Sequence, residues 1–312
     1  MFYSLLKAYS RFAHRILFWK IRVNRPEVLA EKGPVLFAAN HPNSFLDGII
    51  LTTLSNEPVY SLARGDAFRT KRTNQLLRRM KLLPVYRQSE GVENLEHNYT
   101  TFSACLQAFT AGSSVLIFSE GRCENEWHLR PLKKGTARLA FAAWEQGIPL
   151  TVIPTGFNYS SFFHLGKEVH LRFGRPIRFE AFDPGESQGR NHLAFNALLK
   201  KELEALVYEI KPDDQAGLRQ HFPLRRHPLF LLPGLAGLIL HTPLYLAAKG
   251  ASARFRKTGH YDSVLHALLL LGYPFYLLLL ALPAAFLLPF PYPFLLLLSP
   301  LLAASAIRSF GR

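Results

Sequence analysis

The chain is poor in cysteine, with only Cys105 and Cys123 among its 312 residues, in unrelated local contexts. Two isolated thiols provide neither a disulfide framework nor the paired spacing of a metal site. We therefore expect a reducing, cytosol-facing compartment and no bound metal. A glycine-rich nucleotide loop is also missing, so the sequence predicts no cofactor.

Acidic residues are scarce as well. Asp and Glu number 22 against 37 Lys and Arg, which gives a formal net charge of +15 and favours an anionic partner. The chain is 49% hydrophobic, and its Lys and Arg residues are scattered or flank apolar runs. A nucleic-acid-binding protein with a membrane tether would need a base-stacking or groove-binding element, which we do not find. We expect anionic membrane lipids as partners, and no nucleic acid.

The N-terminal 23 residues lack the uninterrupted apolar stretch and the small-residue cleavage site of a signal peptide. Apolar residues recur three and four positions apart between basic ones. This pattern predicts an amphipathic helix over residues 1–23 that lies at a membrane interface. A helix that packs its apolar face on the domain core is the alternative.

Residues 24–212 alternate between strand-like and helix-like patterns and form the predicted catalytic domain. Strands are expected at 35–39, 58–63, 82–86, 114–118, 150–155 and 168–173, and helices near 44–54, 67–80, 92–111, 135–146 and 190–210. Strands separated by helices of this length predict an α/β fold, with a mostly parallel sheet covered by helices on both faces.

Residues 213–312 are predicted to be hydrophobic, membrane-embedded helices. The run 229–248 is interrupted by two prolines, and the run 264–288 has no charged side chain and is long enough to span about 30 Å of hydrocarbon. A shorter run ends at Ile307.

Basic residues suggest the orientation of these runs. Lys249 to Lys257 and the C-terminal Arg308 and Arg312 lie on one side if the last two runs form a hairpin. We therefore expect the catalytic domain on the cytoplasmic face. The run 229–248 has basic residues at both ends, so the sequence leaves open whether it crosses the membrane.

One imidazole and one carboxylate lie just beyond the first predicted strand, 35–39. The carboxyl end of a strand is where open α/β sheets bind ligands. His41 and Asp47 are separated by about 240° on a regular helix, so they can meet only if the turn bends. If they meet, Asp47 accepts a hydrogen bond from one ring nitrogen and leaves the other as a base. The alternative is a solvated histidine in a turn whose residues Asn40 and Ser44 cap a helix.

A second group of polar residues follows the strand 114–118. Arg122 is suited to bind phosphate oxygens in a fork, and Glu120, across Gly121, to orient a hydroxyl or that arginine. An ordinary Glu-Gly turn is the alternative. Lys134 begins the next predicted helix, and the backbone N–H groups of that helix can add to an anion site. The alternative is that Lys133 and Lys134 are a solvated lysine pair with no ligand.

These segments together resemble the motifs of the glycerolipid acyltransferase family, the lysophosphatidic acid and glycerol-3-phosphate acyltransferases. His41 and Asp47 are similar to the first motif, which is Asn-His, four residues, Asp. The gap here is five residues, as in a subset of glycerol-3-phosphate acyltransferase-like members.

The other motifs occur in the family's order, and the resemblance covers about residues 35–180. Leu83-Pro-Val-Tyr-Arg87 looks like the second motif, in which the arginine helps to bind the acceptor phosphate. Phe118 to Arg122 resembles the third motif, shortened by one residue and with Ser119 in place of proline. Val152-Ile-Pro-Thr-Gly156 matches the fourth, which shapes the acyl pocket.

The resemblance implies an O-acyltransferase of phospholipid synthesis. It would move a fatty acyl group from a coenzyme A or acyl-carrier-protein thioester to a hydroxyl of glycerol-3-phosphate or 1-acylglycerol-3-phosphate (lysophosphatidate). The candidate catalytic residues are His41 and Asp47, and the candidate substrate-binding residues are Arg87, Glu120, Gly121, Arg122 and Lys134.

The sequence favours direct attack of the acceptor hydroxyl on the thioester, because neither serine nor cysteine lies in a nucleophile elbow. It does not decide the acceptor, the donor or the acyl chain length. A phospholipid-remodelling transacylase and a non-catalytic lipid-binding relative are the alternative functions.

Overall fold

The computed structural model describes residues 2–86, 95–223 and 231–310. The chain divides into two compact units. The first comprises Met1–Lys7, Val23–Asn158 and His170–Pro212, and the second comprises Ala8–Arg22, Tyr159–Val169 and Asp213–Arg312.

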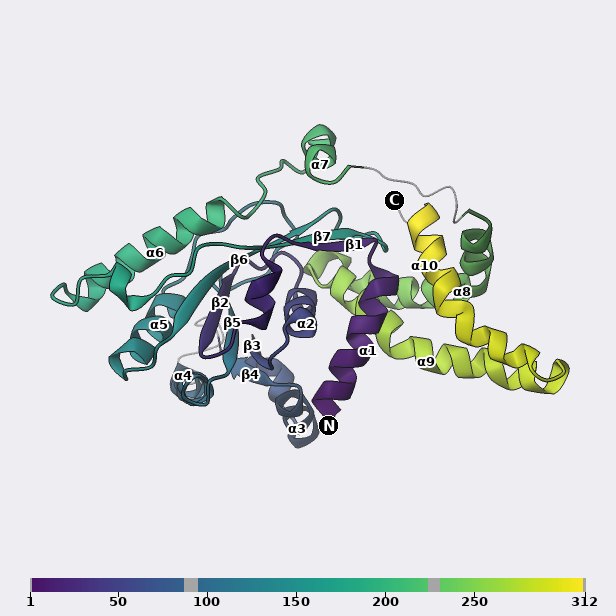
Figure 1. Cartoon of the computed structure of the whole chain (residues 1–312), viewed down its shortest axis with the longest axis horizontal. Coiled ribbons are helices and arrows are strands. Elements are labelled where there is room, and N and C mark those ends of the chain that lie inside the picture. Colours follow the sequence, from purple (N-terminus) through teal and green to yellow (C-terminus); the bar gives the residue numbers. More distant parts are fainter. Residues whose placement is uncertain (1, 87–94, 224–230, 311–312) are drawn as a thin grey trace. The chain divides into compact units, whose positions relative to one another are not determined.

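Seven strands and ten α-helices are found in the described residues (Figure 1). The strands are β1 (Lys20–Val23), β2 (Val35–Ala39), β3 (Val59–Arg64), β4 (Leu82–Val85), β5 (Ser114–Phe118), β6 (Thr151–Tyr159) and β7 (Glu168–Phe173). The helices are α1 (Phe2–Leu17), α2 (Phe45–Leu54), α3 (Lys71–Arg79), α4 (Leu95–Thr110), α5 (Gly135–Glu145), α6 (Gln188–Glu204), α7 (Gln215–His221), α8 (Leu231–Ser252), α9 (Tyr261–Leu287) and α10 (Ser299–Phe310).

The strands form one sheet in the order β1-β7-β6-β2-β5-β3-β4. Strand β2 pairs in parallel with β5 and β6, and β3 pairs in parallel with β4 and β5. Strand β7 runs antiparallel to β6, because Gly174 N donates to Pro154 O and Ser160 N donates to Glu168 O. The predicted mostly parallel sheet is confirmed.

Strand β2 is buried along its whole length and divides the core of the first unit. Leu36 and Ala38 pack in one cluster with buried residues of α4, α5 and α6. On the opposite face α2 packs on β3, where Gly48 approaches the Ser61 side chain. Helices therefore cover both faces, as predicted (Figure 1).

The N-terminal helix α1 ends at Leu17, and the next residues form β1 instead of continuing it. In β1, β-branched Ile21 and Val23 alternate with basic residues, a pattern that favours a strand over a helix. The apolar residues Phe2, Leu5 and Phe12 are exposed along one stripe of α1. The amphipathic character predicted for this segment therefore belongs to residues 2–17.

The second unit contains two helical segments that are long and apolar enough to cross a membrane, Leu231–Thr258 and Tyr261–Leu287, judged by length and composition alone. Their apolar side chains are largely exposed, as at Phe275 and Leu282 of α9. Helix α8 packs closely on α10, since a Cβ added at Gly237 would lie 2.0 Å from Leu302 O. Small residues allow such close helix contacts in apolar surroundings.

Candidate active site

The candidate site lies at the carboxyl ends of the neighbouring parallel strands β2 and β5. Residues 41–44 form the turn that follows β2, and Ser119 to Gly121 follow β5. Ser119 N donates to Ala39 O at 2.8 Å, which extends the pairing of the two strands by one step. The strand ends therefore bring His41 and Glu120 together, although 79 positions separate them in sequence.

His41 and Asp47 meet directly. His41 Nδ1 lies 2.9 Å from Asp47 Oδ2, and the same oxygen accepts a hydrogen bond from Asn43 N at 2.9 Å. The two side chains meet because His41 precedes α2, and because Ser44, with φ of 51°, reverses the chain before the helix begins. The predicted bend therefore includes a residue with positive φ.

The two side chains of this pair differ in burial and in the part that each takes in the hydrogen bond. The Asp47 side chain is fully buried and the His41 side chain is 15% exposed. The Asp47 carboxylate can only accept, so we assign the Nδ1 proton to His41 and leave Nε2 as the unprotonated nitrogen. The ring also stacks on Phe118, with ring centroids 3.6 Å apart. These two contacts hold the imidazole in one orientation.

Glu120 is directed inward rather than toward solvent. One carboxylate oxygen accepts from His41 N and the other from Arg130 N, each at 2.9 Å. Burial raises the pKa of Glu120 to about 7, against the opposing effect of these two hydrogen bonds. In the structure Glu120 therefore fixes the backbone of His41, and its role in binding substrate remains a prediction.

The other predicted anion-binding residues are spread around the turn after β5. Arg122 is exposed and forms an ion pair with Glu124. Gly121 has a φ of 72° and packs under Lys133, since an added Cβ would lie 3.0 Å from Lys133 Cγ. Lys134 is exposed at the N-terminus of α5.

Lys133 therefore lies closer to the Glu-Gly turn than Lys134, the residue predicted from the sequence. The lysine pair was visible in the sequence, but which lysine faces the turn depends on where α5 begins. Arg87 lies outside the described residues.

Asn40 has a role that the sequence did not suggest. Its side chain accepts from Phe157 N at 2.7 Å and donates to Phe157 O at 3.1 Å, which ties the end of β2 to β6. Asn40 does not cap a helix, and Ser44 makes no side-chain cap hydrogen bond. Ser44 does occupy the N-cap position of α2, but His41 is paired with Asp47 and is not a solvated turn residue.

Cys123 also supports the turn. Its Sγ accepts a hydrogen bond from Ser44 N at 2.9 Å, and burial raises the pKa of the thiol to about 12. A protonated, hydrogen-bonded thiol is a poor nucleophile. Within the residues that the structure describes, no three His, Cys, Asp or Glu side chains group as they would around a metal ion.

Comparison with known proteins identifies this part of the chain. The family model described as "Acyltransferase" matches residues 20–158, a range that contains β1 to β5, all of β6 except Tyr159, and the His41–Asp47 pair. Residues 20–158 form an acyltransferase domain. The prediction of an acyltransferase from the sequence motifs is confirmed.

No match is found among curated proteins. Among solved structures, the chain is similar to the crystal structure of the 1-acyl-sn-glycerophosphate (LPA) acyltransferase PlsC from Thermotoga maritima. The identity is 15%, the match covers 65% of this chain and 79% of that chain, and the TM-score is 0.45.

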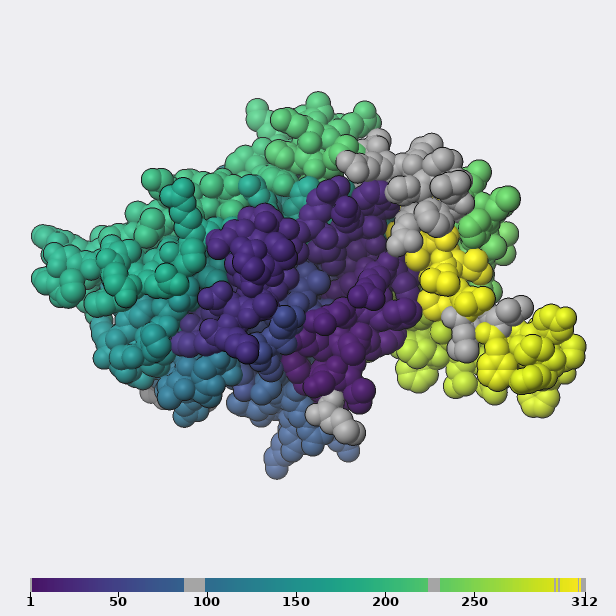
Figure 2. All heavy atoms as spheres, in the orientation of Figure 1, coloured from purple at the N-terminus to yellow at the C-terminus, as the bar shows by residue number. Residues whose placement is uncertain are grey.

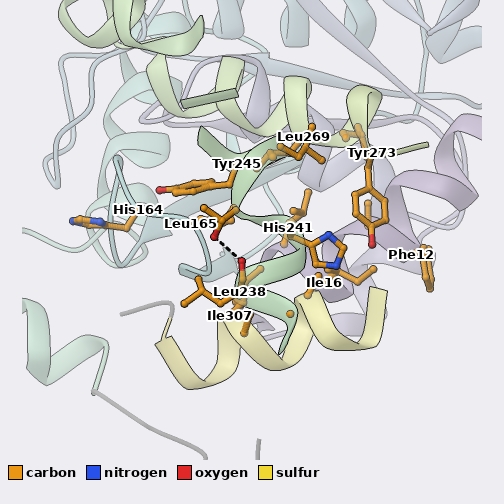
Figure 3. Close-up of a pocket in the computed structure, with 18 of the residues that line it drawn as sticks. Phe12, Ile16, His164, Leu165, Leu238, His241, Tyr245, Leu269, Tyr273 and Ile307 are labelled. Carbon is orange, nitrogen blue, oxygen red and sulfur yellow. Dashed lines mark hydrogen bonds between the residues drawn. The ribbon is translucent and has the colours of Figure 1, made fainter. Parts of the chain in front are cut away.

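A cavity of about 280 Å³ lies in the second unit (Figure 3). It is lined by residues of α1, α8, α9 and α10, among them Phe12, Leu238, Leu269 and Ile307. The lining includes no Lys, Arg, Asp or Glu side chain. Such a cavity suits an apolar chain better than a charged substrate.

Proposed function

We propose that the chain is a membrane-bound glycerolipid acyltransferase. It transfers a fatty acyl group from a coenzyme A or acyl-carrier-protein thioester to a hydroxyl of glycerol-3-phosphate or 1-acylglycerol-3-phosphate in phospholipid synthesis. The observation that carries the proposal is the 2.9 Å contact between His41 and the buried Asp47, at the strand ends of an acyltransferase domain.

His41 is the general base of the proposed reaction. Its Nε2 removes the proton from the acceptor hydroxyl as the oxygen attacks the thioester carbonyl carbon. The carbon–sulfur bond then breaks, and His41 returns the proton to the departing thiolate. Asp47 stabilises the imidazolium that exists between these two proton transfers. A positioned base typically contributes about 10²–10⁴-fold to the rate.

The acceptor phosphate is bound by cations near the same turn. Arg122, Lys133 and Lys134 are exposed around the turn after β5, and each presents N–H groups suited to phosphate oxygens. Arg122 exchanges its ion pair with Glu124 for the phosphate when the acceptor binds. Arg87, which follows β4 in the sequence, is the fourth proposed phosphate-binding cation.

We propose direct transfer, without an acyl-enzyme, because the Cys123 thiol beside the site is a poor nucleophile. Cys123 is engaged by Ser44 N, and its pKa of about 12 keeps it protonated at neutral pH. The base therefore acts on the acceptor hydroxyl itself.

The membrane part of the proposal is supported by composition. Two helical segments, Leu231–Thr258 and Tyr261–Leu287, have the length and hydropathy of membrane spans, and α1 exposes an apolar stripe beside basic residues. We propose that the catalytic domain faces the cytoplasm, because basic residues flank the apolar runs on that side.

The test is an assay of the purified chain in detergent with each acceptor and both thioester donors, read by mass spectrometry. The proposal predicts acylated glycerol-3-phosphate or lysophosphatidate, formed only with a thioester donor. Acyl transfer from an intact phospholipid would instead identify a remodelling transacylase. Absence of any acylated product, with membrane binding retained, would identify a non-catalytic lipid-binding protein.

A further inference from the structure

Helix α3 and its flanking residues form a cationic segment on the first unit. Residues 69–81 contain six Lys and Arg and no Asp or Glu: Arg69, Lys71, Arg72, Arg78, Arg79 and Lys81. None of the nine residues of α3 is buried. In Figure 2 the α3 segment, coloured blue, projects from the surface of this unit. Nearly all of its charge is therefore available to a partner.

The charges lie on the outward face of the helix. At 3.6 residues per turn, Lys71, Arg72 and Arg79 fall within about 100° of one another. The half-buried residues Asn74 and Leu77 occupy the opposite side, which rests on the domain. Leu76 lies at the margin of the cationic face and is 48% exposed.

The fold itself does not use four of these six cations in ion pairs. Arg69, Lys71, Arg72 and Arg79 form no ion pair within the described part of the chain, and nearby Asp66 pairs with Arg64. Lys71 and Arg72 occupy the first turn of α3, where the helix dipole disfavours positive charge. The arrangement weakens an isolated helix and is explained by an anionic partner outside the chain.

The helix is nevertheless preformed. Thr70 and Thr73 form a reciprocal capping box, in which Thr73 N donates to Thr70 Oγ1 at 3.1 Å and Thr70 N donates to Thr73 Oγ1 at 3.2 Å. Lys81 is held at the other end, where its Nζ donates to Tyr60 OH at 2.9 Å. The cationic face is thus presented in a fixed helical form.

We propose that α3 is a docking helix for an anionic phospholipid surface. Lys71, Arg72 and Arg79 contact headgroup phosphates, and Leu76 enters the interface beside them. Cations with an apolar residue at their margin are the pattern of helices that lie on membranes, and each cation near an anionic leaflet adds to the attraction. This inference rests on the proposed placement of the chain at a membrane.

The experiment is hydrogen exchange of the full chain in lipid nanodiscs. Discs of phosphatidylcholine alone are compared with discs that also contain phosphatidylglycerol. We expect the backbone amides of α3 to exchange at least about 10-fold more slowly in the anionic discs at low salt. Raising the salt to about 1 M, where the Debye length falls to about 3 Å, should remove the difference.

In the variant K71Q/R72Q/R79Q, the amides of α3 should exchange at the same rate in both kinds of disc. Removing the three cations should lower the apparent affinity of α3 for the anionic surface by about 100-fold. The matched control R190Q/K200Q/K201Q removes three exposed cations of α6 and should keep it. Unchanged exchange in the core strands β2 and β5 verifies that each variant is folded.

The inference is overturned if α3 exchanges equally in both kinds of disc, or if the triple α3 variant keeps the effect. It is also overturned if a soluble acidic protein slows exchange of α3 and anionic lipid does not. The exchange of the α9 amides distinguishes a failure of this inference from a failure of the membrane proposal. If α9 is protected in all discs and α3 in none, only the docking helix is wrong, whereas an unprotected α9 would refute the membrane placement itself.

Discussion

The carboxylate of Glu120 accepts a hydrogen bond from the backbone N–H of His41 at 2.9 Å. Its other oxygen accepts a hydrogen bond from Arg130 N, so Glu120 holds the turn that contains His41 by its main chain. Glu120→Gln replaces one acceptor by an NH₂ group that faces a backbone donor. We expect kcat to fall by up to about 100-fold, because small displacements of a catalytic group have effects of this size.

Separate measurements of kcat and KM for Glu120→Gln distinguish this positioning role from a role in substrate binding. A residue that only binds the acceptor would raise KM for the glycerol phosphate and leave kcat nearly unchanged. Glu126→Gln is the matched control, because the Glu126 carboxylate pairs with the Arg130 side chain, whereas that of Glu120 binds the His41 backbone. A rise in KM alone for Glu120→Gln would contradict the positioning role.

The raised pKa of Glu120 predicts a pH dependence of stability. Burial moves this pKa from 4.5 to about 7, so the folded chain holds a proton that the unfolded chain has released. Stability contributed by this group is therefore complete below pH 4.5 and is lost as the pH rises through 7, on the order of 3 kcal/mol in total. The measurement is the difference in Tm between the wild type and Glu120→Gln in detergent across this range. A difference that stays constant or grows with pH would contradict the sign.

Cys123 should be dispensable for chemistry. Because burial raises the pKa of its thiol to about 12, we expect Cys123→Ala to retain acyl transfer within a few-fold. The lost hydrogen bond from Ser44 N should cost about 1 kcal/mol of stability. Alkylation of Cys123 by iodoacetamide should be slow at pH 8. Loss of all activity, or a trapped thioester on Cys123, would establish an acyl-enzyme instead.

Gly156 in β6 leaves no room for a side chain. An added Cβ would lie 2.7 Å from Leu206 Cβ and 3.1 Å from the Leu206 backbone. We expect Gly156→Ala to destabilise the first unit by about 1–3 kcal/mol through overpacking, measured as a lower Tm in detergent. Gly189→Ala on α6, where nothing lies within 4 Å of the added Cβ, is the control. Equal Tm values for the two variants would refute the packing argument.

The strands of the sheet could be predicted well from the sequence, because buried strands form short apolar runs with clear ends. Strands β2, β5 and β7 have the predicted bounds. Strand β6 continues to Tyr159, four residues past the prediction, since Asn40 supplies hydrogen-bonding partners for Phe157 beyond the apolar run. Helix α6 ends at Glu204 rather than near 210. Such ends depend on tertiary partners that local patterns do not contain.

The site could be predicted as a set of residues, but its geometry could not. His41, Asp47 and Glu120 were recognisable from their motifs and strand-end positions. The positive φ of Ser44 at the turn between His41 and Asp47 could not be predicted, because a serine rarely adopts such a φ and no local pattern marks it. The inward direction of Glu120 depends on two backbone donors, at residues 41 and 130, which only the folded chain brings together.

The most direct test is the rate of acyl transfer by His41→Ala in a single turnover, with a thioester donor and a glycerol phosphate acceptor, followed by mass spectrometry. The account predicts a loss of about 10²–10⁴-fold with acceptor binding retained. A rate within a few-fold of the wild type, in a variant with an unchanged Tm, would show that His41 is not the base.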